Sequence, residues 1–259
     1  MQSMTDRHEL LASLDALLQP ERFKDYCHNG LQVEGRLPVR TLVSGVTASL
    51  ALIEAAIDAK ADAILVHHGL FWRGFDGRIG GWMRQRLGLL LQHNTNLFAY
   101  HLPLDAHPQW GNNAQLGQRL GLVALEGLAG RFGEQSLGCL GEAESGRSFD
   151  SEADLARHVE KVLNRPVTLV NTARKAIKKI AWCSGGAQGY FEAAIAAGAD
   201  AFITGEISEP QAHIARESGV AYLACGHHAT ERYGAPAVAA HVAAQLGLAH
   251  QFIDIDNPA

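Results

Sequence analysis

The 259-residue sequence has no apolar run long enough to span a bilayer, and Met1 to His8 lack the apolar core of a signal peptide. It has no run of Lys or Arg, and its formal net charge of -5 argues against nucleic acid as the main partner. Cysteine is sparse, and no two of the four form a C-x-x-C pair, so we expect buried free thiols in a reducing compartment. They are Cys27, Cys139, Cys183 and Cys225. These absences predict a cytoplasmic protein with no membrane partner.

What remains is an ordinary globular composition with one anomaly. Hydrophobic residues make up 47% and charged residues 19%, and the length suits one large domain or two modest ones. The anomaly is histidine: there are 13, and four of them form the adjacent pairs His67-His68 and His227-His228. Adjacent histidines are often only a surface or core pair, so their positions in the predicted fold must decide their role.

The pattern of apolar residues predicts an α/β fold. Leu42 to Val46 reads as a buried strand, Ala48 to Lys60 as an alanine-rich helix, and Ala63 to Val66 as a second strand, after an amphipathic helix from Glu9 to Leu18. Alternation of strand, helix and strand predicts parallel pairing with a right-handed crossover. We therefore expect sheets covered by helices on both faces, in α/β/α layers.

The second half of the chain repeats the first. Glu54-Ala55-Ala56-Ile57 aligns without a gap with Glu192-Ala193-Ala194-Ile195, an offset of 138 residues, and the strands on both sides align as well. Downstream, a strand and then a helix ending in Gly-Leu follow in both halves. Matched elements in the same order predict two related lobes, residues 1–127 and 128–259.

The unusual polar residues all follow predicted strands, where open α/β sheets bind their ligands. Five of them form the candidate metal-ligand set, namely His67, His68, Asp105, His227 and Glu231. Three histidines with two carboxylates suit two divalent ions, and nitrogen and oxygen ligands without thiolate indicate zinc, iron or manganese. We expect one site at the interface of the two lobes.

The spacing leaves two arrangements open for the first histidine pair. Successive side chains of a strand point to opposite faces, so His67 and His68 serve one metal only if the chain leaves the strand there. Otherwise each reaches a different ion of a pair. Gly69 would supply the freedom to turn. His227 and Glu231 lie four residues apart, which one helical turn places on the same side.

Three stretches of sequence carry the candidate ligands, namely Val66-His67-His68-Gly69-Leu70-Phe71-Trp72, Tyr100-His101-Leu102-Pro103-Leu104-Asp105-Ala106-His107 and Ala224-Cys225-Gly226-His227-His228-Ala229-Thr230-Glu231. Together with Asn29-Gly30-Leu31-Gln32-Val33 and Phe202-Ile203-Thr204-Gly205-Glu206, they resemble the Nif-three-like dinuclear-metal family, whose members are often called GTP cyclohydrolase I type 2 homologues. The resemblance implies the same five ligands and a ring-shaped homo-oligomer, a hexamer. It also implies interlocked α/β lobes, with the C-terminal segment packing back on the first lobe and no inserted third domain between the halves.

Other polar residues are candidates for supporting roles. His101 either orients a ligand or binds metal, or is a buried hydrogen-bonded histidine. Glu206, at the repeat position of His68, either faces the site as a general base or serves as a capping carboxylate. His213 and His228 are candidates for contact with the ligands. Trp72 and the neighbouring Phe71 either stack on a planar base or pack in the core.

The sequence supports three functions for such a site. The first is a metal-dependent hydrolase, in which two cations lower the pKa of a water and Glu206 or His101 moves protons. The family name suggests GTP, a nucleotide, as substrate, although no Walker-type phosphate loop is present and Ser184-Gly185-Gly186 is a weak anion-binding candidate. The second is a regulatory or scaffold protein that binds metal without turnover. The third is di-iron redox chemistry.

Overall fold

A computed structural model describes residues 5–173 and 175–259 of the chain. The chain forms two compact units: unit 1 is Met1–Gly111 with Arg232–Asp256, and unit 2 is Asn112–Glu231 with Asn257–Ala259. The division differs from the boundary near residue 127 expected from the sequence, because α5 (Asn112–Leu120) and β5 (Leu122–Ala124) belong to unit 2. Met1 to Met4, part of the stretch compared above with a signal peptide, lie outside the described residues.

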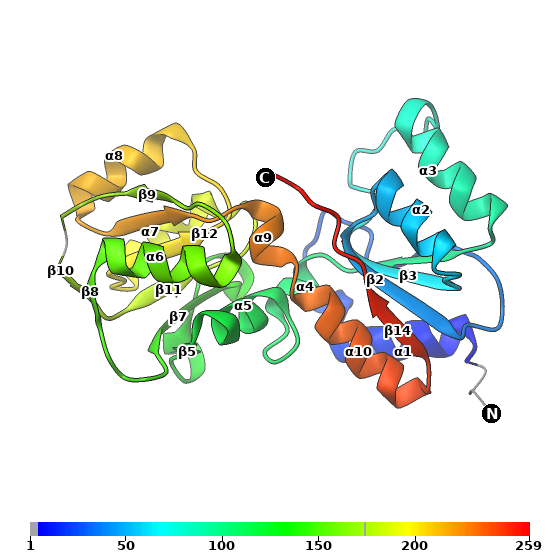
Figure 1. Ribbon diagram of the computed structural model, residues 1–259, viewed down its shortest axis with the longest axis horizontal. Helices are drawn as coiled ribbons and strands as arrows, with labels where there is room; N and C mark the ends of the chain where they lie inside the picture. Colours follow the sequence, from blue (N-terminus) through cyan, green and yellow to red (C-terminus); the bar gives the residue numbers. More distant parts are fainter. Residues whose placement is uncertain (1–4, 174) are drawn as a thin grey trace. The chain divides into compact units, whose positions relative to one another are not determined.

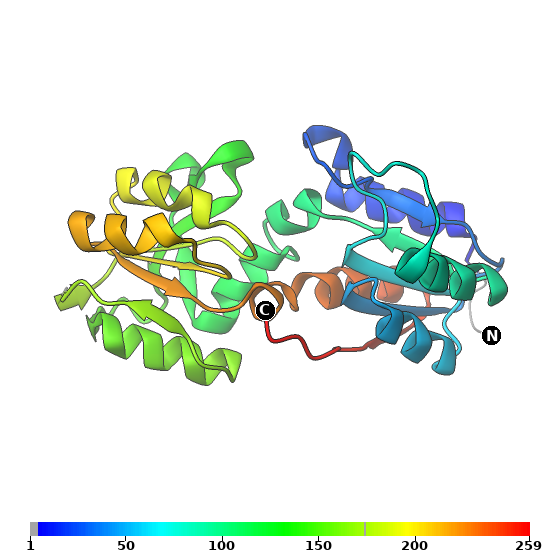
Figure 2. The ribbon, with the colours of Figure 1, turned by 90° about the horizontal axis from the view of Figure 1, so that it is seen from above.

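Unit 1 contains a mostly parallel sheet with strand order β1-β4-β3-β2-β14, in which only β1 runs antiparallel to its neighbour. Its helices and strands are α1 (Arg7–Leu18), η1 (Pro20–Arg22), β1 (Gly30–Val33), β2 (Thr41–Thr47), α2 (Leu50–Asp58), β3 (Ala63–His68), α3 (Gly81–Gln92), β4 (Asn96–Ala99), α4 (Leu102–Ala106), α10 (Gly234–Leu246) and β14 (Ala249–Phe252). Figures 1 and 2 show helices on both faces of this sheet.

The strands of unit 1 separate two apolar layers because successive side chains alternate between faces. Leu65 of β3 and Phe98 of β4 pack with α1 and α10, whereas Ile64 and Leu97, one residue earlier in each strand, pack with α2 and α3. All four side chains are fully buried. Both faces of the parallel strands are therefore apolar, as the predicted α/β/α layering requires.

Unit 2 has a mixed sheet with strand order β5-β7-β11-β12-β13-β9, and β6 also pairs with β7. Its remaining elements are η2 (Gly127–Gly130), β6 (Arg131–Phe132), η3 (Glu134–Ser136), β7 (Gly138–Ala143), β8 (Phe149–Ser151), α6 (Glu152–Leu163), β9 (Thr168–Val170), β10 (Lys175–Ile177), β11 (Ile180–Trp182), η4 (Gln188–Tyr190), α7 (Phe191–Ala196), β12 (Ala201–Thr204), α8 (Glu209–Ser218), β13 (Ala221–Ala224) and α9 (His227–Glu231). Phe202 of β12 packs against Phe191 and Tyr222, with ring centroids 5.8 and 5.6 Å away.

The repeat seen in the sequence corresponds to equivalent structure. β2-α2-β3 of unit 1 and β11-α7-β12 of unit 2 are both parallel βαβ segments. Asp62 precedes β3 and accepts hydrogen bonds from the backbone N–H groups of Arg40 and Thr41, at 2.9 and 3.1 Å. Asp200, 138 positions later by the alignment, accepts equivalent bonds from Lys178 and Lys179, both at 2.9 Å. The predicted α/β class and pair of related units are confirmed.

The chain passes from one unit to the other after each of two short helices, α4 and α9. After β4 and α4 it leaves unit 1 and forms α5 in unit 2, and after β13 and α9 it returns to form α10 in unit 1. β14 then pairs with β2 and completes the sheet of unit 1. Each unit therefore contains chain from both halves of the sequence, and this exchange interlocks the repeats.

Within the described residues, no helix combines the length and the apolar character that crossing a membrane requires.

Candidate metal centre

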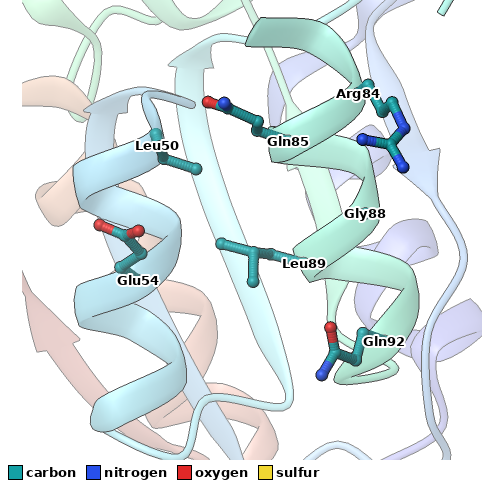
Figure 3. A pocket seen from close by; sticks show the side chains of 7 residues that line it. All are labelled: Leu50, Glu54, Arg84, Gln85, Gly88, Leu89 and Gln92. Carbon is teal, nitrogen blue, oxygen red and sulfur yellow. The ribbon is translucent and has the colours of Figure 1, made fainter. Parts of the chain in front are cut away.

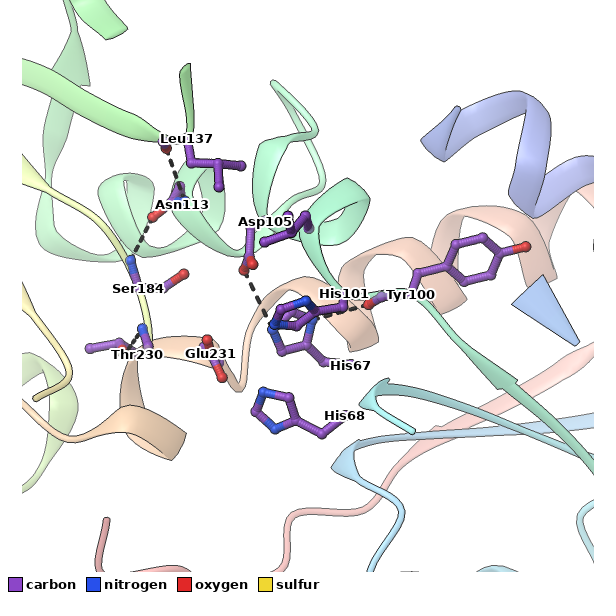
Figure 4. A network of polar contacts seen from close by, with 12 residues as sticks. His67, His68, Tyr100, His101, Asp105, Asn113, Leu137, Ser184, Thr230 and Glu231 are labelled. Atoms are coloured by element: carbon purple, nitrogen blue, oxygen red, sulfur yellow. Dashed lines mark hydrogen bonds and ion pairs between the residues drawn. The ribbon is translucent and has the colours of Figure 1, made fainter. Parts of the chain in front are cut away.

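Three imidazoles gather in unit 1 where the parallel strands end. His67 and His68 are the last two residues of β3, and His101 is the N-cap residue of α4, just after β4. The ring centroid of His67 lies 4.5 Å from that of His68 and 5.0 Å from that of His101. One ring nitrogen from each histidine lies within 4.8 Å of the other two, close enough for a shared metal ion. Figure 4 shows the three side chains together.

Each of these imidazoles makes a hydrogen bond through Nδ1. Nδ1 of His67 lies 3.0 Å from the carbonyl oxygen of Tyr100, and Nδ1 of His101 lies 2.9 Å from Oδ1 of Asp25. Both oxygens are acceptors, so Nδ1–H donates and the neutral ring carries its lone pair on Nε2. Nδ1 of His68 lies 3.0 Å from the hydroxyl of Thr47, the paired residue of β2. A contact of this kind orients a metal-ligating histidine.

Asp105 adds a carboxylate to the same unit. It lies on α4, four residues after His101, and its Oδ1 is 3.5 Å from Nε2 of His67. Asp105 is buried, and His67 is fully inaccessible to solvent. A buried carboxylate beside a buried imidazole is the donor set that a divalent cation favours.

Gly69 has a different role from the one expected. The backbone of β3 remains extended through His68, and Gly69 is not in the left-handed region. Instead, a Cβ at position 69 would lie 2.3 Å from Oε1 of Gln32 and 2.6 Å from the Cβ of Ala99. Oε1 of Gln32 also accepts a 2.7 Å hydrogen bond from the N–H of Leu70. Glycine is needed because the segment after the histidines packs against β1 and β4 without room for a side chain.

Unit 2 contributes a histidine and a carboxylate from one turn of helix. His227 and Glu231 lie on α9, and Nε2 of His227 is 3.1 Å from Oε2 of Glu231. On the other side of the ring, Nδ1 of His227 lies 2.7 Å from Oε1 of Glu206. The hydrogen bond with Glu231, and the charges of both carboxylates, raise the pKa of His227 to about 9 although burial opposes this. The hydrogen bond from His227 lowers the pKa of Glu206.

The glycines at the ends of β11 and β12 make space for α9. Gly185 has φ +67, and a Cβ there would lie 2.0 Å from Oε1 of Glu231. A Cβ at Gly205 would lie 2.7 Å from the Cα of His227. The N–H of Gly185 donates to Oγ1 of Thr230 at 2.9 Å (Figure 4). This N–H is thus engaged within the protein, and the glycines serve close packing around the ligands.

The other candidate residues lie in varied environments. His213 is exposed on α8, and its Nε2 is 3.0 Å from Oε1 of Glu209. His228 is buried on α9, and its backbone N–H donates to the carbonyl of Ala259 at 3.1 Å. Trp72 lies beside His101, with ring centroids 5.1 Å apart. Of these, Trp72 is placed against the imidazoles, and His213 pairs with a residue of its own helix.

Sequence reasoning missed two residues that contact the imidazoles. Asp25 reaches His101, and Thr47 reaches His68. Thr47 could have been found, since it ends the strand beside β3. Asp25 lies in a loop without any periodic pattern, 76 residues from His101, so only the folded chain brings the two together.

Unit 1 also has a groove of about 510 Å³ between α2 and α3, away from the histidines. Its walls are formed by Leu50, Glu54, Arg84, Gln85, Gly88, Leu89 and Gln92 (Figure 3). None of the candidate ligands lines this groove.

Fold and site define a class: an α/β protein of two repeated units, with clustered imidazole and carboxylate groups that could hold metal ions. Residues 5–258 match the model of the Duf34/NIF3 (NGG1p interacting factor 3) family, and the chain belongs to that family. This confirms the resemblance inferred from the motifs.

Relatives match over nearly the whole chain. A protein of Allochromatium vinosum named GTP cyclohydrolase 1 type 2 homolog is 50% identical, covering 99% of this chain and 98% of its own. One of the same name from Pseudomonas aeruginosa is 49% identical, covering 96% and 97%. The solved structure of protein ybgI, described as of unknown function, is 42% identical with a TM-score of 0.91, covering 98% and 99%. TTHA1606 from Thermus thermophilus is 32% identical with a TM-score of 0.84, covering 98% and 99%.

Proposed function

We propose that this protein holds two divalent cations and uses them for hydrolysis. The proposed ligands are His67, His68 and Asp105 from unit 1 and His227 and Glu231 from unit 2. The observation that carries the proposal is that one ring nitrogen from each of His67, His68 and His101 lies within 4.8 Å of the other two. The buried carboxylate of Asp105 lies beside His67. Five ligands exceed the four that zinc usually takes, which favours a pair of ions. The donor set fits zinc, iron or manganese.

A pair of cations supplies Lewis acidity that makes water a usable nucleophile at neutral pH. The residues of this chain orient the ligands and exchange protons near the metal site. The carbonyl of Tyr100 fixes His67, and Glu206 fixes His227, each through Nδ1. Glu206 is half-exposed and accepts a 3.1 Å hydrogen bond from Gln188. Its position therefore suits both orientation of His227 and proton exchange with solvent, the role predicted for it from the sequence. For His101, the geometry favours a further metal ligand.

The names of the relatives suggest a nucleotide, GTP, as the substrate class. Trp72 next to the imidazoles offers an aromatic surface for a planar base. Tyr26, whose ring centroid is 4.9 Å from that of His101, is 55% exposed and could take part in the same contact. Metal-replete protein is expected to hydrolyse at least one member of a panel of GTP, phosphoesters and cyclic amides. Metal binding without any turnover would instead favour the regulatory or scaffold role.

Metal content tests the ligand assignment. Protein purified as wild type is expected to contain two equivalents of metal per chain, whereas His68→Ala and Glu231→Ala lose at least one. His213→Ala is the matched control, because it removes a histidine that pairs with Glu209 on exposed α8. Unchanged metal content in both ligand variants would refute the assignment. Optical and paramagnetic spectra of anaerobically purified protein distinguish a di-iron redox centre from a hydrolytic site.

We also propose that copies of this chain assemble into a homo-oligomer, a ring of six. Large apolar side chains are exposed on α3 and the loop before it: Ile79, Trp82 and Leu91 are 56, 61 and 60% exposed. Exposed large apolar side chains are candidates for burial at an interface between copies. Light scattering is expected to give the mass of a hexamer, and Trp82→Glu with Leu91→Glu is expected to reduce it. A monomeric wild type would contradict this proposal.

A further inference from the structure

The loop between η1 and β1 is fixed against the segment that follows the histidines of β3. The N–H of His28 donates to the carbonyl of Phe71 at 3.2 Å, and the N–H of Arg73 donates to that of Tyr26 at 2.6 Å. Cys27 and Trp72 form an antiparallel β-bridge. These backbone contacts give Asp25, in the same loop, a defined position beside the three imidazoles.

Both carboxylate oxygens of Asp25 are engaged. Oδ1 accepts from the N–H of Cys27 at 3.0 Å and from Nδ1–H of His101 at 2.9 Å. Oδ2 accepts from the N–H of Leu102 at 2.8 Å and from the side-chain amide of Asn29 at 3.0 Å. The Asp25 side chain is only 3% exposed. Several donors in a buried place hold this carboxylate rigidly and favour its ionised form.

The ring of His101 is held in place by other groups as well. Tyr26 and Trp72 lie edge-on to it, with centroids 4.9 and 5.1 Å away, and the backbone N–H of His101 donates to Asn29 at 2.8 Å. The aromatic rings restrict the tilt of the imidazole without selecting which nitrogen carries the proton. Only Asp25 does that, because its oxygen accepts the Nδ1 proton.

We propose that Asp25 is a positioning residue that turns His101 into a third imidazole ligand from unit 1, beside His67 and His68, by holding its proton on Nδ1 and directing Nε2 toward those two rings. This inference rests on the proposed metal-binding function and adds a residue to it. A carboxylate on the far nitrogen of a ligating histidine fixes its tautomer and strengthens its donor nitrogen, and losing such a contact costs 10- to 100-fold in metal affinity in other proteins. Nδ1 of His67 faces a carbonyl oxygen and Nδ1 of His68 a hydroxyl, whereas the Nδ1 partner of His101 is a carboxylate.

The test uses Co²⁺, whose absorption bands report on ligand number and geometry, with chelator-stripped full-length protein. Asp25→Asn keeps the size of the side chain and removes its charge, and it is expected to weaken Co²⁺ binding about 10- to 100-fold and to change the absorption bands. His101→Ala is expected to do the same. The double variant should bind no more weakly than His101→Ala alone, because Asp25 acts through His101. Wild-type affinity and spectrum in Asp25→Asn, or additive losses in the double variant, would overturn the proposal.

Two controls separate this role from folding and from the proposed function. Asp62→Asn removes a carboxylate that likewise accepts two backbone N–H bonds in unit 1 but contacts no imidazole, so it should lower the urea midpoint without changing Co²⁺ affinity. If His68→Ala abolishes binding while Asp25→Asn does not, the Asp25 inference alone fails. If His68→Ala and Glu231→Ala both bind Co²⁺ normally, the metal-site assignment itself fails.

The tautomer can be measured in the wild-type protein itself. Metal-free wild-type protein labelled with ¹⁵N-histidine is expected to show His101 protonated at Nδ1, with its signals assigned by their loss in His101→Gln. A ring protonated at Nε2 alone would overturn the proposal.

Discussion

Oε1 of Glu206 lies 2.7 Å from Nδ1 of His227, on the side of the ring opposite Glu231. The imidazole therefore stands between two carboxylates and is protonated in the metal-free protein at neutral pH. A metal ion bound at Nε2, as proposed, would have to displace that proton, so metal binding by His227 would compete with protons.

The first prediction concerns the pH dependence of metal-free stability. The pKa of His227 is raised to about 9, so its stabilising contribution is fully present below the unfolded-state value near 6.5 and is lost as the pH rises through 9. The free energy of unfolding should fall by at most about 3 kcal/mol across this range. Urea denaturation of chelator-treated protein at pH 6.5 and 9.5 measures it. His227→Gln should lack this component, and an equal fall in that variant would contradict the assignment.

The second prediction concerns Gly69. Gly69→Ala places a methyl group 2.3 Å from Oε1 of Gln32 and 2.6 Å from the Cβ of Ala99, so it should cost about 1 to 3 kcal/mol of stability, as overpacking does. Urea midpoints give the value. Gly80→Ala is the matched control, since a Cβ there meets nothing within 4 Å. Equal urea midpoints for the two variants would show that the segment after β3 accommodates the added methyl group without loss of stability.

The third prediction tests whether the close packing of Gly185 against α9 is needed to keep Glu231 in place. Gly185→Ala brings a Cβ within 2.0 Å of Oε1 of Glu231 at a residue with φ +67, so Glu231 must move. Metal analysis should show the loss of at least one equivalent from this variant. Gly189→Ala, where the added Cβ meets nothing within 4 Å, should retain the wild-type content. Retention of both equivalents by Gly185→Ala would show that Glu231 is not needed.

The fourth prediction concerns the thiols. All four cysteines are free and buried, and burial together with the charge of Asp25 raises the pKa of Cys27 to about 12. Because thiolates are the reactive form, none should react with a disulfide reagent at pH 8 in the native protein. All four should react in urea. A rapid native reaction would place at least one thiol at the surface, and mass spectrometry would identify it.

Much of the fold could be predicted from local sequence because strands and helices of a βαβ unit leave clear patterns. The repeat was visible for the same reason, since equivalent positions such as Asp62 and Asp200 perform the same backbone contact. α3 went unrecognised because it begins with two glycines, the N-cap residue Gly80 and the first residue Gly81, and because the apolar side chains of Trp82 and Leu91 are exposed. α8 could have been found from its capping box of Ser208 and Gln211.

The local sequence pattern does not determine the exchange of α5 and α10 between the units, and only the family resemblance implied interlocked lobes with a C-terminal segment that packs back on the first. α5 follows α4, and α10 follows α9, with the same local pattern whether each helix packs on its own unit or on the other. Likewise, the partner of each imidazole depends on contacts between distant segments, as for Asp25 and His101. Candidate ligands could be named from the sequence, but the groups that orient them depend on tertiary packing.

The return of the chain to unit 1 has a consequence for biosynthesis. α10 supplies Val238 and Val242 to the apolar layer beneath β2 and β3, and β14 closes the edge of that sheet. The ribosome synthesises these segments after Asn112–Glu231 of unit 2, so nascent unit 1 has an incomplete apolar layer while that stretch emerges. A pause or truncation late in translation would therefore expose the oldest part of the chain, the part that carries His67 and His68, to aggregation.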